Sequence, residues 1–128
     1  MAQLTGSQMK YLHVIYKATK SKSGIRSVDV ARELGITKAS VSRMVKLLAG
    51  MRFIDVKQSG YIELTPKGKA EGNAIHRRIT AVHAFFSDYL GLSEPEATDS
   101  AYCFVSQFSE HCVDQLLVKG WVPEQTGA

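Results

Sequence analysis

The chain has 128 residues, of which 45% are apolar and 22% are charged, and a formal net charge of +4. This length suits one domain, or one domain with a small appendage, and the composition excludes a disordered chain. No apolar run is long enough to cross a bilayer, and the N-terminus lacks the basic-then-apolar pattern of a secretory signal, so we expect a cytoplasmic protein.

The positive charge is concentrated in the first part of the chain. Residues 1–80 contain 15 Lys and Arg against 5 Asp and Glu, a balance of +10. Residues 81–128 contain 1 Lys against 7 Asp and Glu, a balance of −6. A basic half of this kind is typical of proteins that bind a polyanion, although a well-solvated basic surface would have the same composition.

Two helices are predicted at the start of the chain. Thr5 and Gln8 have the spacing of a capping box before an amphipathic helix that spans about Gly6–Lys20. Ser27 is placed to cap a second helix. That helix is expected to end at Gly35, because glycine readily adopts the left-handed conformation that closes helices.

The next predicted helix, capped by Thr37 and ended by Gly50, has two different halves. Its first half is small and polar, whereas its second half carries apolar residues at helical spacing. This apolar stripe comprises Val41, Met44, Val45 and Leu48. Phe53–Val56 and Tyr61–Leu64 are short β-prone runs separated by turn residues, which predicts a hairpin.

Three more helices are predicted after the hairpin. The first spans about Thr65–Leu90, with a threonine cap, a proline in its first turn and two glycines that lower the helix propensity of its start. Ser93 and Glu96 have capping-box spacing before a helix that ends near Gln107. Ser109–Gly120 forms the last helix.

The order helix, turn, helix and hairpin is that of a winged helix-turn-helix. The predicted fold class is therefore mainly α: three helices and a β-hairpin, followed by an α-helical region. We place the winged helix-turn-helix in residues 1–72, the helical region in residues 73–120 and a flexible tail in residues 121–128.

The helix capped by Thr37 has the properties of a DNA-recognition helix. Its apolar half packs on its own domain, so its small polar half faces outward, where such helices contact base edges and phosphates. The predicted DNA contacts are Ser27, Thr37, Lys38, Ala39, Ser40, Ser42, Arg43 and Lys46, with Lys57 and Gln58 at the hairpin tip. Polar helix ends are common on surface helices, and the combination with the basic half and the hairpin favours DNA binding.

From about Leu4 to Lys119 the sequence resembles the metal-dependent repressors typified by the diphtheria toxin repressor and the manganese transport regulator MntR. The resemblance rests on the segments MKYLHVIY, VDVARELGITKASVSRMVKLL, LTPKGKAEG and FFSDYLGL, and on Cys103. Among these, LTPKGK directly after a winged helix-turn-helix is a moderately specific feature.

The resemblance implies a homodimeric repressor that binds palindromic operators in double-stranded DNA. It implies that residues 73–120 form a dimerisation domain, with the contact between about His83 and Leu117. It also implies a divalent transition metal (Mn, Fe or Zn) as cofactor, while the residues of this chain leave open whether it binds an altered metal or none.

The metal ligands of the family fall on residues of a different kind. Carried over one position at a time, they correspond to Lys10, His13, Ile79, His83, Asp99, Cys103, Ser106 and Gln107. The primary site keeps only Cys103, which together with lysine, isoleucine, serine and glutamine is not a transition-metal donor set. The candidates for an altered site are His13, His83, Asp99, Cys103 and Gln107.

Three hypotheses follow for Lys10, which occupies the first-helix position. Its ammonium replaces the charge of the metal opposite Cys103 and Gln107; or its stem lies along the surface with the charge in water; or an altered site binds a softer metal. Cys103 and Cys112 are expected to be reduced thiols in the core, since two cysteines do not make a disulfide framework.

The favoured function is thus a DNA-binding transcriptional regulator, and more specifically a repressor. The alternative is a winged-helix module that binds proteins without reading DNA sequence; the balance of +10 in residues 1–80 argues against it. An enzyme is not expected, because no acid–base pair, nucleophile motif or phosphate-binding glycine loop is visible.

Overall fold

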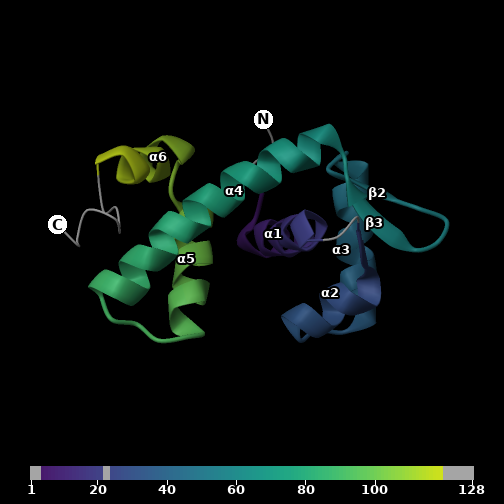
Figure 1. Ribbon diagram of the computed structural model, residues 1–128, viewed down its shortest axis with the longest axis horizontal. Helices are drawn as coiled ribbons and strands as arrows, with labels where there is room; N and C mark the ends of the chain where they lie inside the picture. The colour runs from purple at the N-terminus through teal and green to yellow at the C-terminus, as the bar shows by residue number, and fades with distance from the viewer. Residues whose placement is uncertain (1–3, 22–23, 120–128) are drawn as a thin grey trace. The chain divides into compact units, whose positions relative to one another are not determined.

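The computed structural model describes residues 4–21 and 24–119, so the predicted tail lies outside the described residues. The chain divides into two compact units: a winged unit, Lys10–Ala74, and a helical unit, Met1–Met9 with Ile75–Ala128. Helices predominate and three short strands form one antiparallel sheet, which confirms the predicted fold class (Figure 1). Within the described part of the chain, no helix has both the length and the hydropathy needed to cross a membrane.

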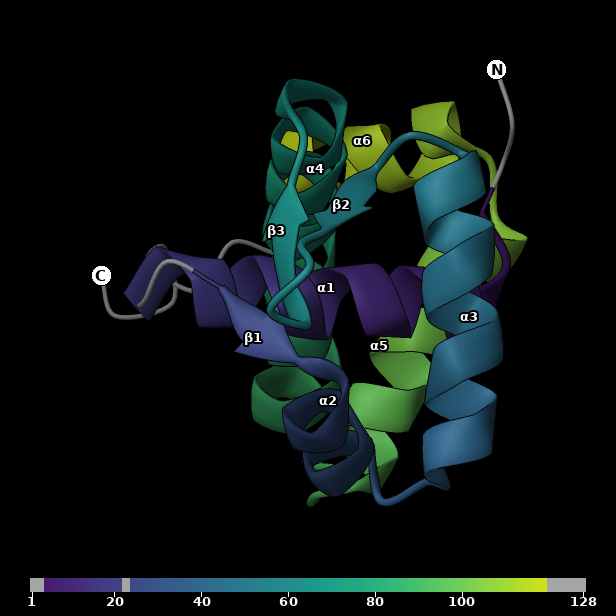
Figure 2. The ribbon, with the colours of Figure 1, turned by 90° about the vertical axis from the view of Figure 1, so that its right-hand side faces the viewer.

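The winged unit contains the predicted helices and hairpin. Its elements are α1 (Gly6–Ser21) from Lys10 onward, β1 (Ile25–Arg26), α2 (Ser27–Leu34), α3 (Lys38–Gly50), β2 (Ile54–Val56), β3 (Tyr61–Leu64) and the start of α4 (Pro66–Ala84). In the sheet, β3 lies between β1 and β2 (Figure 2). Strand β1 was not predicted, because two residues are too short to show a strand's alternating pattern.

Three of the four predicted N-terminal caps in this part of the chain are observed. Thr5 and Gln8 form the reciprocal capping box, Thr37 Oγ1 accepts a hydrogen bond from the Ser40 N–H, and Thr65 Oγ1 accepts one from the Gly68 N–H. The prediction that Ser27 caps α2 is wrong.

The start of α2 differs from the prediction because the preceding residue is part of a strand. Arg26 is paired with Tyr61 in the sheet and holds the extended N-cap conformation (φ −93°, ψ 156°), so the chain enters the helix directly at Ser27. The Arg26 N–H donates to Asp29 Oδ2 at 3.3 Å, which makes Asp29 the side chain that satisfies the backbone at this helix start.

The core of the winged unit is formed by the predicted apolar faces. Its most deeply buried side chains are Leu12, Ile15, Val30, Val41, Leu48, Ile54 and Ile62. Of the predicted stripe on α3, Val41, Val45 and Leu48 are buried and Met44 is half-buried. Ile62 on the central strand faces Ile25 on one side and Val56 on the other, which fixes the register of the sheet.

The two glycines at the start of α4 allow this helix to lie very close to its neighbours in the winged unit. A Cβ atom at Gly68 would overlap the backbone carbonyl of Phe53. A Cβ atom at Gly72 would lie 2.6 Å from Cδ1 of Tyr16, whose hydroxyl donates to Asn73 Oδ1 at 3.1 Å. The glycines therefore weaken the helix locally but permit its packing.

The helical unit contains the rest of α4, a π-helical turn η1 (Phe85–Tyr89), α5 (Glu96–Gln107) and α6 (Glu110–Lys119). The helical backbone after the hairpin thus ends close to the predicted Leu90. Ser109 Oγ accepts from the Cys112 N–H and caps α6. Buried side chains of this unit include Ile75, Ile79, Val82, Ala97, Ala101, Val105 and Val113.

The predicted capping box at the start of α5 is not formed. Pro95 takes the N-cap position, and the carboxylate of Glu94 accepts hydrogen bonds from the Thr98 N–H at 3.0 Å and the Thr98 hydroxyl at 2.7 Å. The helix start is therefore satisfied by the acidic residue before the proline rather than by Ser93 and Glu96.

Arg78 joins α4 to α6 within the helical unit. Its guanidinium donates to both carboxylate oxygens of Asp114, at 2.9 and 3.3 Å, and lies 3.8 Å from Glu110 Oε1. The hydrogen bonds from Arg78 hold the pKa of Asp114 below its usual value. Such a two-point contact fixes the angle between the helices better than a single charge pair would.

We expect Gly68→Ala to destabilise the protein, because the added methyl group requires α4 to move away from Phe53. Overpacking of this kind costs ~1–3 kcal/mol, whereas Gly to Ala in an open helix gains ~0.5–1 kcal/mol. Gly50→Ala is the matched control, since no atom lies within 4 Å of its added Cβ. Urea unfolding should separate the two variants, and equal stabilities would contradict the packing role.

Candidate DNA-binding interface

The outward face of α3 carries the residues that were predicted to contact DNA. Lys38, Ala39, Ser42, Arg43 and Lys46 are exposed, and Ser40 is half-buried. The helix contains no acidic residue, and among the described residues no carboxylate is paired with its three cations. The face therefore combines three cations with the small side chains of alanine and serine.

A hydroxyl network organises the first turn of α3. The Thr37 hydroxyl donates to Ser40 Oγ at 3.0 Å, and Arg43 Nη2 donates to the same oxygen at 3.4 Å. Thr37 and Ser40 thus use their hydroxyl groups to cap the helix and orient Arg43. Ala39 and Ser42 are small and exposed, so they allow the helix to approach the base edges of a DNA groove closely.

The hairpin supplies the second part of the surface. Its turn is closed by hydrogen bonds from the Lys57 N–H to the Tyr61 carbonyl at 2.8 Å and from the Gly60 N–H to the Lys57 carbonyl at 2.9 Å. Lys57 and Gln58 are exposed, as a wing contact requires. Lys57 Nζ lies 3.6 Å from Glu63 Oε1, so part of its charge is balanced within the hairpin.

Comparison with known proteins identifies the family. Residues 3–68 match the model of the N-terminal DNA-binding domain of iron-dependent repressors. The chain belongs to the iron-dependent repressor family. It is a DNA-binding transcriptional regulator, and its winged unit corresponds to the matched domain.

Individual relatives agree with this assignment. An uncharacterized HTH-type transcriptional regulator of Methanocaldococcus jannaschii is 27% identical over 109 residues, which cover 84% of this chain and 87% of that protein. The HTH-type transcriptional regulator MntR of Oceanobacillus iheyensis is 25% identical over 112 residues, 88% of this chain and 76% of that protein. The fold is similar to the solved structure of the manganese regulator SloR, with a TM-score of 0.75 and 19% identity. That match covers 94% of this chain, which spans 56% of the SloR chain.

The positions predicted to correspond to family metal ligands are distributed over both units of this chain. In the winged unit, His13 is buried and Lys10 is half-buried on α1. In the helical unit, Ile79 is buried, and Asp99, Cys103 and Gln107 are exposed on α5. Ser106 is buried and donates its hydroxyl to the Cys103 carbonyl at 3.1 Å.

These residues do not fit a transition-metal site. Among the described residues, no group of three or more His, Cys, Asp and Glu side chains lies close enough together to hold an ion. His83, a candidate ligand, bonds through Nε2 to Glu94 Oε2 at 2.9 Å. Ile79 offers no donor atom, and the Ser106 hydroxyl is used by the backbone of its own helix.

Both cysteines differ from the prediction of a core position. Cys103 and Cys112 are free thiols, as expected, but both are exposed. The buried face of α5 passes through Ala97, Ala101 and Val105, and Cys103 lies on the other side of this helix.

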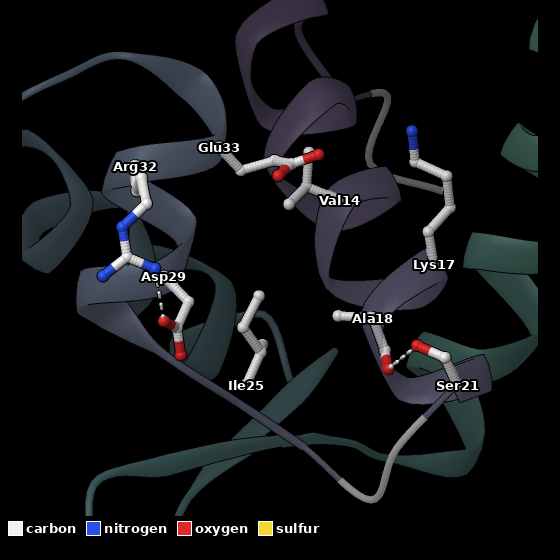
Figure 3. Close-up of a pocket in the computed structure, with 8 residues that line it drawn as sticks. All are labelled: Val14, Lys17, Ala18, Ser21, Ile25, Asp29, Arg32 and Glu33. Carbon is white, nitrogen blue, oxygen red and sulfur yellow. Dashed lines mark hydrogen bonds and ion pairs between the residues drawn. The ribbon is translucent and has the colours of Figure 1, made fainter.

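A recess of about 380 Å³ lies between α1, β1 and α2 in the winged unit (Figure 3). It is lined by Val14, Lys17, Ala18, Ser21, Ile25, Asp29, Arg32 and Glu33. Its only acidic groups are Asp29 and Glu33, and Asp29 is paired with Arg32 at 3.1 Å. The recess therefore lacks the imidazole and thiolate donors that a transition metal prefers.

Glu94 is the residue of the helical unit that the sequence-based prediction missed. It caps α5 and bonds to His83, so it joins the end of α4 to the start of α5. These hydrogen bonds hold the pKa of its carboxyl below the usual value. The sequence feature that could have indicated this cap is a glutamate directly before a proline. It was overlooked because Ser93 and Glu96 match the S-x-x-E capping pattern at the same place.

Replacing Arg43 or Ser42 by Ala should weaken operator binding while helix content and oligomeric state are unchanged, because both side chains are exposed on α3. A bidentate contact of arginine with guanine contributes roughly 1–3 kcal/mol of discrimination. Arg77→Ala, which removes an exposed arginine from the helical unit, is the control. Unchanged operator affinity in both α3 variants, measured by fluorescence anisotropy, would place the reading helix elsewhere.

Proposed function

We propose that this regulator acts in the cytoplasm as a homodimeric repressor of a palindromic operator. The observation that carries the proposal is the outward half of α3, where Lys38, Arg43 and Lys46 surround small side chains on a capped helix without acidic residues. Such a surface suits the major groove, whose edges offer acceptors to cations. A two-fold symmetric dimer presents two such helices, and the matching DNA site is a palindrome.

The helical unit supports the choice of a second copy as the dimer partner. Aromatic rings stack in two pairs, Phe85 with Tyr89 at 5.4 Å and Phe104 with Phe108 at 4.3 Å between ring centroids. Tyr89 and Phe108 are 65% and 47% exposed. An exposed aromatic patch of this kind is typical of a protein–protein interface. The charge balance of −6 in residues 81–128 disfavours DNA as the molecule that binds there.

We also propose that operator binding does not depend on a transition metal. The support is the donor chemistry described above: isoleucine, lysine and glutamine occupy positions that carry ligands in the family. The hypothesis that Lys10 supplies the charge of the absent ion belongs to this proposal. Its half-buried position on α1 is compatible with either that role or a surface stem.

The dimer is tested with Phe108→Asp. A carboxylate in the aromatic group should give a monomer by light scattering at micromolar concentration and should lower operator affinity, because the two half-sites are no longer bound together. Val56→Asp is the control for oligomeric state alone, since Val56 on the wing is 49% exposed, close to the 47% of Phe108, and lies outside the helical unit. A wild-type monomer that binds its operator with full affinity would refute the dimer.

Metal dependence is tested by operator affinity with and without chelator, followed by addition of Mn, Fe or Zn. We expect no change for the wild type and weaker binding for Lys10→Met. Lys17→Met removes an exposed lysine from the same helix and serves as control. Loss of binding on chelation, with recovery on adding one metal, would overturn the proposal. Equal operator affinity of Lys10→Met and wild type would show that Lys10 does not replace the charge of the metal.

A further inference from the structure

Arg26 and Tyr61 form a cation–π pair beside the turn of the wing. The two residues face each other in the pairing of β1 with β3, and the guanidinium carbon lies 4.5 Å from the centre of the tyrosine ring. A Cβ atom at Gly60, the last residue of the hairpin turn, would lie 3.7 Å from Arg26 Nη1. The guanidinium thus lies over the aromatic ring and close to the turn of the wing.

The charge of Arg26 is not balanced by a carboxylate within the described part of the chain. The neighbouring cations differ in this respect. Lys57 is paired with Glu63 at 3.6 Å, and Arg32 is paired with Asp29 at 3.1 Å. Arg26 therefore retains its full charge, although stacking on Tyr61 restricts where its side chain can point.

A stacked guanidinium has a definite preference for its ligand. The guanidinium carbon lies over the ring of Tyr61, and the N–H donors point outward in the guanidinium plane, where they match two oxygens of a phosphate or carboxylate. Figure 2 shows that β1 and β3 run side by side and that α2 begins directly after β1. Arg26 thus stands at the junction of the wing with the helix-turn-helix.

We infer that Arg26, oriented by Tyr61, binds a phosphate of the DNA backbone beside the wing. This inference rests on the DNA-binding function of the winged unit and adds a contact that positions the protein without reading bases. Arg26 is a positioning contact for the duplex, and Tyr61 acts through Arg26. The contact is independent of base sequence, so it contributes equally to operator and to random duplex.

The test is the affinity for operator and for random duplex over a range of salt concentrations. Because the proposed dimer carries two copies of Arg26, Arg26→Ala should reduce the slope of log K against log salt by about 1.8, which is about 0.9 for each phosphate contact, and weaken binding roughly 25-fold, or fivefold per contact, at about 0.15 M salt. Both duplexes should lose the same factor. Arg32→Ala, which removes an exposed arginine already paired with Asp29, should leave slope and affinity unchanged.

Variants at the ring separate orientation from charge. Tyr61→Phe keeps the aromatic face and should behave as wild type, whereas Tyr61→Leu should weaken binding with a smaller change of slope than Arg26→Ala. Arg26→Lys keeps the charge without the planar fork and should be intermediate in affinity. Thermal unfolding of each variant identifies any loss that comes from stability of the wing.

A purely structural role of Arg26 would give a different pattern. The inference is overturned if Arg26→Ala lowers the melting temperature but leaves the salt slope and both affinities unchanged while Arg43→Ala still weakens operator binding. If instead the wild type binds neither duplex even at low salt, the proposed DNA-binding function is itself wrong, and the result does not concern Arg26 in particular.

Discussion

The junction between the wing and the start of α4 is the contact on which the winged unit depends. The Thr65 hydroxyl caps α4 and donates toward the carbonyls of Arg52 and Phe53, at 2.6 and 3.1 Å. One turn later, Gly68 places its bare backbone against Phe53. Thr65 and Gly68 thus hold the start of α4 against Arg52 and Phe53, directly before β2.

This junction also decides which cations of the basic half remain available. Lys67 Nζ donates to the Met51 carbonyl at 2.9 Å and lies 4.6 Å from the centre of the Phe53 ring, so its charge serves the fold. The cations on the outward face of α3, by contrast, have no described carboxylate partner. The net charge therefore overestimates the number of cations available to bind DNA. The available cations are those whose charge is not balanced inside the protein.

The helical unit shows the opposite use of charge. Its cation Arg78 is engaged by Asp114 and Glu110, and the large apolar side chains that it exposes include the aromatic Tyr89 and Phe108. The two units thus differ in the chemistry that they present, one polar and basic, the other apolar and acidic. Ile79, at a position predicted to correspond to a metal ligand, has no donor atom, although the helix that carries it is formed.

By itself, the sequence determined the features that depend on residues close together in the chain. Helix caps at Thr5, Thr37 and Thr65, the apolar stripe of α3 and the hairpin were predictable because capping and helical periodicity act over a few residues. The same locality allowed the outward half of α3 to be predicted as the surface that contacts DNA.

Features that depend on partners distant in the sequence could be established only from the folded chain. Arg26, rather than Ser27, holds the N-cap position of α2 because β3 pairs with β1. Glu94 bonds to His83 because η1 and the turn after it bring the end of α4 near the start of α5. Gly68 is a packing residue because Phe53 lies against it. In each case the deciding contact joins residues 11 or more positions apart, a separation at which sequence pattern carries no information about proximity.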